Sequence, residues 1–177
     1  SGPVITNTMW NGTGLAAAQA IAPGTLTFQA QFNDAVSTES LGPEDVSLLE
    51  VISSSQPVPS SLNFDTNTNS LTVQFDDLPE GEYILTLVSG DGAFENPQGG
   101  DMDGEPTGPG VDGTPTGNGD AGGDYFVAFS VDRTDAGPNA FARLNTLGSL
   151  VFASQDNMGL VNSSTDQENY SFVAQEG

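Results

Sequence analysis

Three reactive side chains are missing from this sequence of 177 residues, which has no cysteine, no histidine and no lysine. Without cysteine the chain has no disulfide, no thiolate nucleophile and no sulfur ligand for a metal. Without histidine it lacks the usual general base near neutral pH and the commonest ligand of zinc, copper and iron. Without lysine it forms neither a Schiff base nor a lysine–asparagine cross-link. Carboxylates, hydroxyls, amides and two guanidinium groups remain.

Positive charge is almost absent as well. Arg133 and Arg143 stand against 24 acidic residues, which gives a formal net charge of −22. Such a field repels nucleic acids and anionic membranes and attracts divalent cations. The sequence contains no run of about 18 apolar residues, the length that could span a bilayer. We therefore expect no nucleic-acid partner, no membrane insertion and an extracellular or cell-surface location, with any export signal outside the chain.

Alternating apolar and polar residues predict an all-β fold, an antiparallel β-sandwich of short strands. Strands are expected at residues 25–32, 46–51, 61–64, 70–75, 83–88 and 125–131. The polar loop between the third and fourth of these predicts a hairpin. The inward positions of the clearest strands predict a core of Leu26, Phe28, Phe32, Leu71, Val73, Phe75, Tyr83, Leu85, Leu87, Phe126 and Phe129.

The segment Leu78-Pro79-Glu80-Gly81-Glu82-Tyr83 adds a more specific signal. Leucine, then glycine, then tyrosine at a strand entrance matches the corner of immunoglobulin-like domains, where a tyrosine hydroxyl bonds to backbone upstream. The competing interpretation is an ordinary turn followed by a strand with an aromatic core residue.

The order of several motifs resembles bacterial Ig-like domains of the S-layer and adhesin type. They are Gly2-Pro3-Val4-Ile5, Asn33-Asp34-Ala35-Val36, Leu41-Gly42-Pro43-Glu44-Asp45-Val46 and Phe129-Ser130-Val131-Asp132, with the strands between them. The resemblance implies an Ig-like β-sandwich in residues 1–133 with a long Gly/Asp-rich loop before the last strand. It implies a non-catalytic structural spacer, adhesion or assembly unit. The partners it implies are neighbouring domains of a larger surface protein, other copies of the chain or cell-surface glycans.

The C-terminal part resembles another family. Leu147-Gly148-Ser149-Leu150-Val151-Phe152 and residues 159–172 look like the opening strands of pre-peptidase C-terminal domains of secreted bacterial proteins. Only the first third of such a domain would fit in residues 144–177. Gly137-Pro138 favours a linker at residues 134–143. The alternative is that residues 144–177 add strands to the first sandwich.

The loop from Ser89 to Asp124 holds twelve glycines and eight carboxylates in 36 residues and has no cationic side chain. Clustered carboxylates favour Ca²⁺, which takes about six to eight oxygen ligands. An EF-hand is excluded because its first and last ligand positions would be Gly99 and Gly110. The predicted ligands of an irregular calcium site are Asp91, Glu95, Asn96, Asp101, Asp103 and Glu105, with Asp112, Asp120 and Asp124 as weaker candidates. The alternative is a solvated spacer without order.

No residues are arranged for catalysis, and we expect no enzyme. Asp76 and Asp77 would point to opposite faces of a strand, and Glu80 and Glu82 flank a turn, so neither pair suits glycoside hydrolysis. The alternative function is a carbohydrate- or peptide-binding accessory domain of a secreted hydrolase, with Trp10 as a stacking platform and aromatic residues of the loop as further contacts. Trp10 as a core residue is the competing interpretation, and the ligand-binding residues stay unknown from the sequence.

Overall fold

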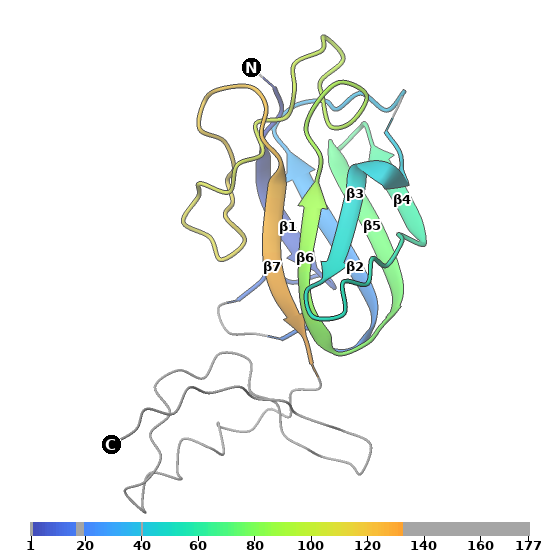
Figure 1. The fold of residues 1–177 in the computed structure, drawn as a ribbon. Helices are drawn as coiled ribbons and strands as arrows, with labels where there is room; N and C mark the ends of the chain where they lie inside the picture. Colours follow the sequence, from blue (N-terminus) through green and yellow to red (C-terminus); the bar gives the residue numbers. More distant parts are fainter. Residues whose placement is uncertain (1, 17–19, 40, 133–177) are drawn as a thin grey trace, which may run out of the picture.

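The computed structural model describes residues 2–16, 20–39 and 41–132, which form a sandwich of two antiparallel sheets (Figure 1). The strands are β1 Ile5–Trp10, β2 Gly24–Phe32, β3 Val46–Glu50, β4 Ser61–Asp65, β5 Ser70–Leu78, β6 Gly81–Leu87 and β7 Tyr125–Val131, with one 3-10 turn, η1 Pro43–Asp45. No helix among these residues has the length and apolar character to cross a membrane. The predicted linker at 134–143 and the second unit at 144–177 lie outside the described residues.

The strand order is that of an immunoglobulin constant-type domain. One sheet runs β1-β2-β5-β4 and the other β3-β6-β7, so the first, second, fifth and fourth strands face the third, sixth and seventh. The tyrosine corner is confirmed, because the Tyr83 hydroxyl donates to the Pro79 carbonyl at 2.9 Å. Burial raises the pKa of Tyr83 and keeps this donor protonated. The predicted Ig-like sandwich and the β4–β5 hairpin are confirmed.

The core follows the predicted alternation with one error. Every predicted core residue is buried except Phe126, whose side chain is 55% exposed. Phe126 and Phe129 stand three positions apart on β7, and side chains an odd number apart on a strand point to opposite faces. The prediction of both as core residues was therefore wrong for Phe126.

Trp10 belongs to the core as well. It is 3% exposed, and its ring lies 4.7 Å from those of Phe28 and Phe129. A buried indole has no face free for a sugar, so the stacking-platform interpretation was wrong.

The long loop between β6 and β7 is folded against the sandwich. Phe94 and Met102 are fully buried members of the core, and the Phe94 ring stacks on Phe32 at 5.9 Å. The Ser37 N–H donates to the Glu95 carbonyl at 2.8 Å, which joins the loop to the segment after β2. In Figure 1 the loop covers one end of the sandwich and then runs beside β7. The interpretation as an unordered solvated spacer was wrong, because the loop contributes apolar core.

Candidate metal centre in the long loop

A tight turn fixes the backbone of the candidate centre. The Asn96 side-chain oxygen accepts the N–H groups of Gln98 at 3.0 Å and Gly100 at 2.8 Å, and the Asn96 N–H donates to the Gly100 carbonyl. This turn sets Glu95 and Asp101 opposite each other as an antiparallel bridge. Asn96 was predicted as a ligand, and the structure places its amide oxygen on the backbone of its own turn.

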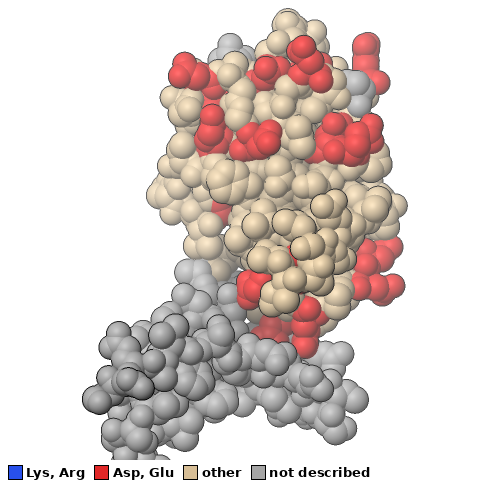
Figure 2. All heavy atoms as spheres, viewed as in Figure 1, with Lys and Arg blue, Asp and Glu red and all other residues tan. Residues whose placement is uncertain are grey.

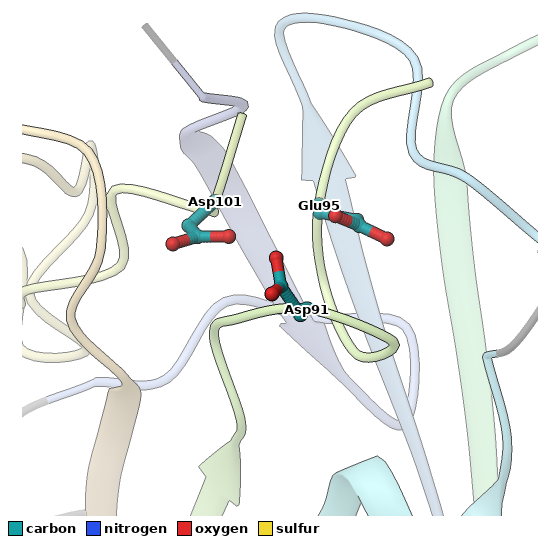
Figure 3. A group of neighbouring side chains, drawn as sticks. All are labelled: Asp91, Glu95 and Asp101. Atoms are coloured by element: carbon teal, nitrogen blue, oxygen red, sulfur yellow. The ribbon is translucent and has the colours of Figure 1, made fainter. Parts of the chain in front are cut away.

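Three of the predicted carboxylates meet beside this turn. One oxygen from each of Asp91, Glu95 and Asp101 lies within 4.8 Å of the others. Figure 3 shows the three side chains converging from neighbouring stretches of the loop. Oxygens that lie about 2.4 Å from one Ca²⁺ are at most about 4.8 Å apart. The spacing therefore fits a calcium shell in which water or backbone carbonyls complete the ligands.

The electrostatics of this cluster favour a cation. The Asp101 Oδ1 atom is buried and accepts no hydrogen bond from the residues that the structure describes. The Glu95 Oε1 atom accepts only a long bond, 3.3 Å, from the Gly92 N–H among its described contacts. Residues 2–132 contain no lysine, arginine or histidine, so no side chain there carries a positive charge. A bound divalent ion would supply the missing partner of Asp101 and reduce the repulsion among the three carboxylates.

The carboxylates of Asp103 and Glu105 accept hydrogen bonds from another part of the loop. The two Asp103 oxygens accept the N–H groups of Asn118 and Gly119, both at 2.9 Å, and the Asn118 amide donates to Glu105 at 3.3 Å. Gly117 has a φ of +104°, and a Cβ there would lie 2.9 Å from an Asp103 oxygen. The structure therefore directs both predicted ligands to the 117–119 turn and does not bring them into the Asp91 cluster.

Asp112 forms a buried network that the sequence did not identify. Its carboxylate, in a residue only 8% exposed, accepts the Thr8 hydroxyl of β1 and both the N–H (3.2 Å) and the hydroxyl (2.9 Å) of Thr114. The Trp10 indole donates to the Thr8 oxygen at 3.2 Å, and the Tyr125 hydroxyl donates to the Asp112 carbonyl at 2.9 Å. Burial, and next the Asp112 charge, raise the pKa of Tyr125, so its hydroxyl stays a donor. Asp112 thus links the loop to β1 and β7.

Two local features of the sequence are consistent with parts of this network. Asp112-Gly113-Thr114 is a turn sequence in which a carboxylate accepts the N–H two residues on. Thr8 shares the inward face of β1 with Trp10, where a hydroxyl needs a partner. Neither signal says that the two residues meet, because 104 positions separate them in the chain.

Thr116 and the N-terminal segment also attach the long loop to the sandwich. The Thr116 N–H donates to the Ile5 carbonyl at 2.8 Å, and its hydroxyl accepts the Ile5 N–H at 2.9 Å and donates to the Asp103 carbonyl at 2.8 Å. The Asp103 N–H donates to the Pro3 carbonyl at 3.0 Å. A Cβ on Gly2 would lie 1.5 Å from the Asp101 carbonyl oxygen, so only glycine fits there. The candidate centre therefore lies beside the start of the chain.

Comparison with known proteins gives one distant likeness. The chain matches no protein-family model and no curated protein sequence. It is similar to a solved structure, the N-terminal part of the bacterial S-layer protein SbsC, with a TM-score of 0.42 and 13% identity over 76% of this chain. The chain spans 24% of that structure. The immunoglobulin-type assignment rests on strand order and on the tyrosine corner, and the resemblances to named domain families stay predictions.

Proposed function

We propose that this domain is a non-catalytic structural module of a bacterial cell-surface or secreted protein, and that one Ca²⁺ held by Asp91, Glu95 and Asp101 stabilises its long loop. The observation that carries the calcium proposal is the convergence of one oxygen from each of the three carboxylates, one of which, Asp101, also has a buried Oδ1 without a donor among the described residues. The module would serve as a spacer, adhesion or assembly unit whose partners are neighbouring domains of a larger protein.

The path of the chain supports a role between neighbouring domains. In Figure 1 the chain enters the sandwich at one end, and β7 leaves it at the other. Domains linked in this way form a string in which each module adds its full length. The candidate centre lies at the entry end, where Gly2 packs on the Asp101 backbone. A calcium ion there would stiffen the end of the module at which the chain enters the sandwich.

The aromatic side chains proposed as ligand contacts of a carbohydrate- or peptide-binding accessory domain are buried. That alternative depended on Trp10 and on aromatic residues of the loop. Trp10 is 3% exposed, and Phe94, an aromatic residue of the loop, is fully buried. We therefore do not propose that function.

Thermal unfolding in EDTA and in excess calcium tests the proposal. Extracellular calcium modules bind with dissociation constants of about 10⁻⁴ to 10⁻³ M. At a calcium concentration about tenfold above that constant, binding adds ~1.4 kcal/mol to the free energy of unfolding and raises Tm by a few degrees. Magnesium should give a smaller rise because it needs a tighter shell and retains its waters.

Two variants locate the effect. Asp101→Asn removes the charge of a cluster carboxylate whose buried Oδ1 has no donor among the described residues, so the calcium-dependent rise in Tm should largely disappear. Asp120→Asn removes a charge from an exposed position of the same loop and should leave the rise intact. Equal melting in EDTA and calcium, or an equal response to magnesium, would refute the calcium site and leave the structural role without it.

A further inference from the structure

A two-residue turn follows β1 and presents Asn11-Gly12 at the surface. The N–H groups of Trp10 and Thr13 each donate to the carbonyl of the other residue, at 2.6 and 3.2 Å. Both central residues have positive φ, 51° for Asn11 and 84° for Gly12, which is the type I′ geometry that Asn-Gly favours in hairpins. Both are exposed, and a Cβ on Gly12 would meet no atom within 4 Å. The glycine that follows the asparagine is therefore open to solvent.

An asparagine that precedes glycine can react with its own backbone, because glycine has no side chain to obstruct the approach. The Gly12 nitrogen gives its proton to hydroxide and attacks Asn11 Cγ. The Cγ–Nδ2 bond then breaks, and Nδ2 takes a proton from water and leaves as ammonia. Water opens the resulting cyclic imide at either of its carbonyl carbons and yields aspartate or isoaspartate. One water is consumed and one ammonia is released, so the reaction needs no oxidant, reductant or enzyme.

The fold stabilises the charge that develops on the Asn11 side chain in this reaction. The Thr27 N–H of β2 donates to Asn11 Oδ1 at 2.8 Å. Attack on Cγ moves negative charge onto that oxygen, and a fixed N–H donor at a developing oxyanion lowers the barrier. The Gly12 N–H donates to no other residue that the structure describes, so its proton is available to base. Its approach to Cγ requires rotation within the turn, which opens the Trp10–Thr13 pair locally.

The same dipeptide at Asn118-Gly119 is also exposed but is held by other residues of the long loop. The Gly119 N–H donates to Asp103 Oδ2 at 2.9 Å, so its proton is bound, and a nitrogen anion there would face a carboxylate. The Asn118 side-chain oxygen accepts the Asp120 N–H at 2.8 Å, and its amide donates to Glu105 at 3.3 Å. Asn-Gly occurs at these two places in the sequence, once with a free glycine N–H and once with a bound one.

We propose that Asn11 is a site of spontaneous deamidation in the folded protein, and that the fold protects Asn118. Isoaspartate adds a methylene to the backbone, which the two-residue turn between Trp10 and Thr13 cannot accommodate. In Figure 1, β1 and β7 point toward the same end of the sandwich, so the turn after β1 lies at the end where β7 leaves it. Figure 2 shows acidic side chains at both ends of the described residues, and the reaction adds a further carboxylate. The proposal does not depend on the calcium site.

Peptide mass spectrometry of the full chain, incubated in EDTA and heavy-oxygen water, tests the proposal. The heavy oxygen marks each imide that is hydrolysed during the incubation, and fragmentation separates isoaspartate from aspartate. Asn11 should convert at least about tenfold faster than Asn118, because the Gly119 nitrogen must first give up its bond to a charged acceptor. The rate at Asn11 should rise with pH, since hydroxide removes the proton of the attacking nitrogen.

The same incubation in urea that unfolds the chain is the matched control. Both Asn-Gly pairs then lose their folded contacts, and their rates should become similar. Conversion of Asn118 as fast as that of Asn11 in the folded chain would overturn the inference. So would an Asn11 that converts in urea but not in the folded chain. A preference for Asn11 that persists unchanged in urea would also overturn it, because that preference would come from the neighbouring sequence and not from the fold.

Discussion

The carboxylate of Asp112 holds the long loop to the sandwich, and its removal should be costly. Asp112→Ala leaves the buried hydroxyls of Thr8 and Thr114, and the Thr114 N–H, without their acceptor. A buried polar group that loses its partner costs ~1–3 kcal/mol. Because two residues are affected, we expect a loss of ~3–5 kcal/mol in the free energy of unfolding, which lowers Tm by roughly 10–20 °C.

Thermal and urea unfolding in EDTA would measure this loss independently of any metal. The chain has one tryptophan, Trp10, whose indole donates to the Thr8 hydroxyl, so its fluorescence reports directly on the network. Asp112→Asn keeps one acceptor oxygen and should lose less stability than Asp112→Ala. Asp120→Ala changes an exposed carboxylate of the same loop and should stay within about 0.5 kcal/mol of the parent chain.

The stability losses of Asp112→Ala and Asp120→Ala together test whether the buried network holds the loop to the sandwich. If Asp112→Ala costs less than about 1 kcal/mol, or no more than Asp120→Ala, then the buried network does not hold the loop. The structural reasoning about residues 112–116 would then be refuted.

Two further predictions concern the backbone of the loop and the titration of η1. In urea unfolding, Gly117→Ala should lower the free energy of unfolding by ~1–3 kcal/mol. Gly119 has a similar φ of +100° but open space where a Cβ would lie, so Gly119→Ala should lower it less. The difference between the two variants measures the clash with Asp103. Burial raises the pKa of Asp45 above 3.8, against the lowering effect of the Gly42 N–H, so the ionised carboxylate opposes folding at neutral pH. Asp45→Asn should therefore be more stable than the parent chain at pH 7, with a gain that shrinks as pH falls through the raised pKa of Asp45 and is lost below about pH 3.8. A gain that is constant with pH would contradict this.

The fold was predictable from the sequence because its signals are local. Alternation identified the strands, and the Leu-Gly-Tyr pattern identified the corner at Tyr83. The error at Phe126 is one of parity, since the alternation of β7 allows only one of Phe126 and Phe129 to face the core.

The site was only partly predictable because its contacts are distant in the chain. Composition indicated an acidic loop, but the carboxylates of Asp101 and Asp103, two residues apart, have different partners. Asp101 faces Asp91 and Glu95, while Asp103 accepts backbone N–H groups of the 117–119 turn. Which carboxylate faces which partner depends on how the loop folds on β1, and no local pattern records that.

We propose above all that Asp91, Glu95 and Asp101 bind one calcium ion. Isothermal titration of the EDTA-stripped, dialysed chain with Ca²⁺ at about 0.1 M NaCl tests it most directly, since salt screens diffuse binding to the many surface carboxylates. We predict one saturable site per chain with a dissociation constant of about 10⁻⁴ to 10⁻³ M. That site should be lost in Asp101→Asn and retained in Asp120→Asn. A titration without a saturable site, or one that Asp101→Asn leaves unchanged, would contradict the claim.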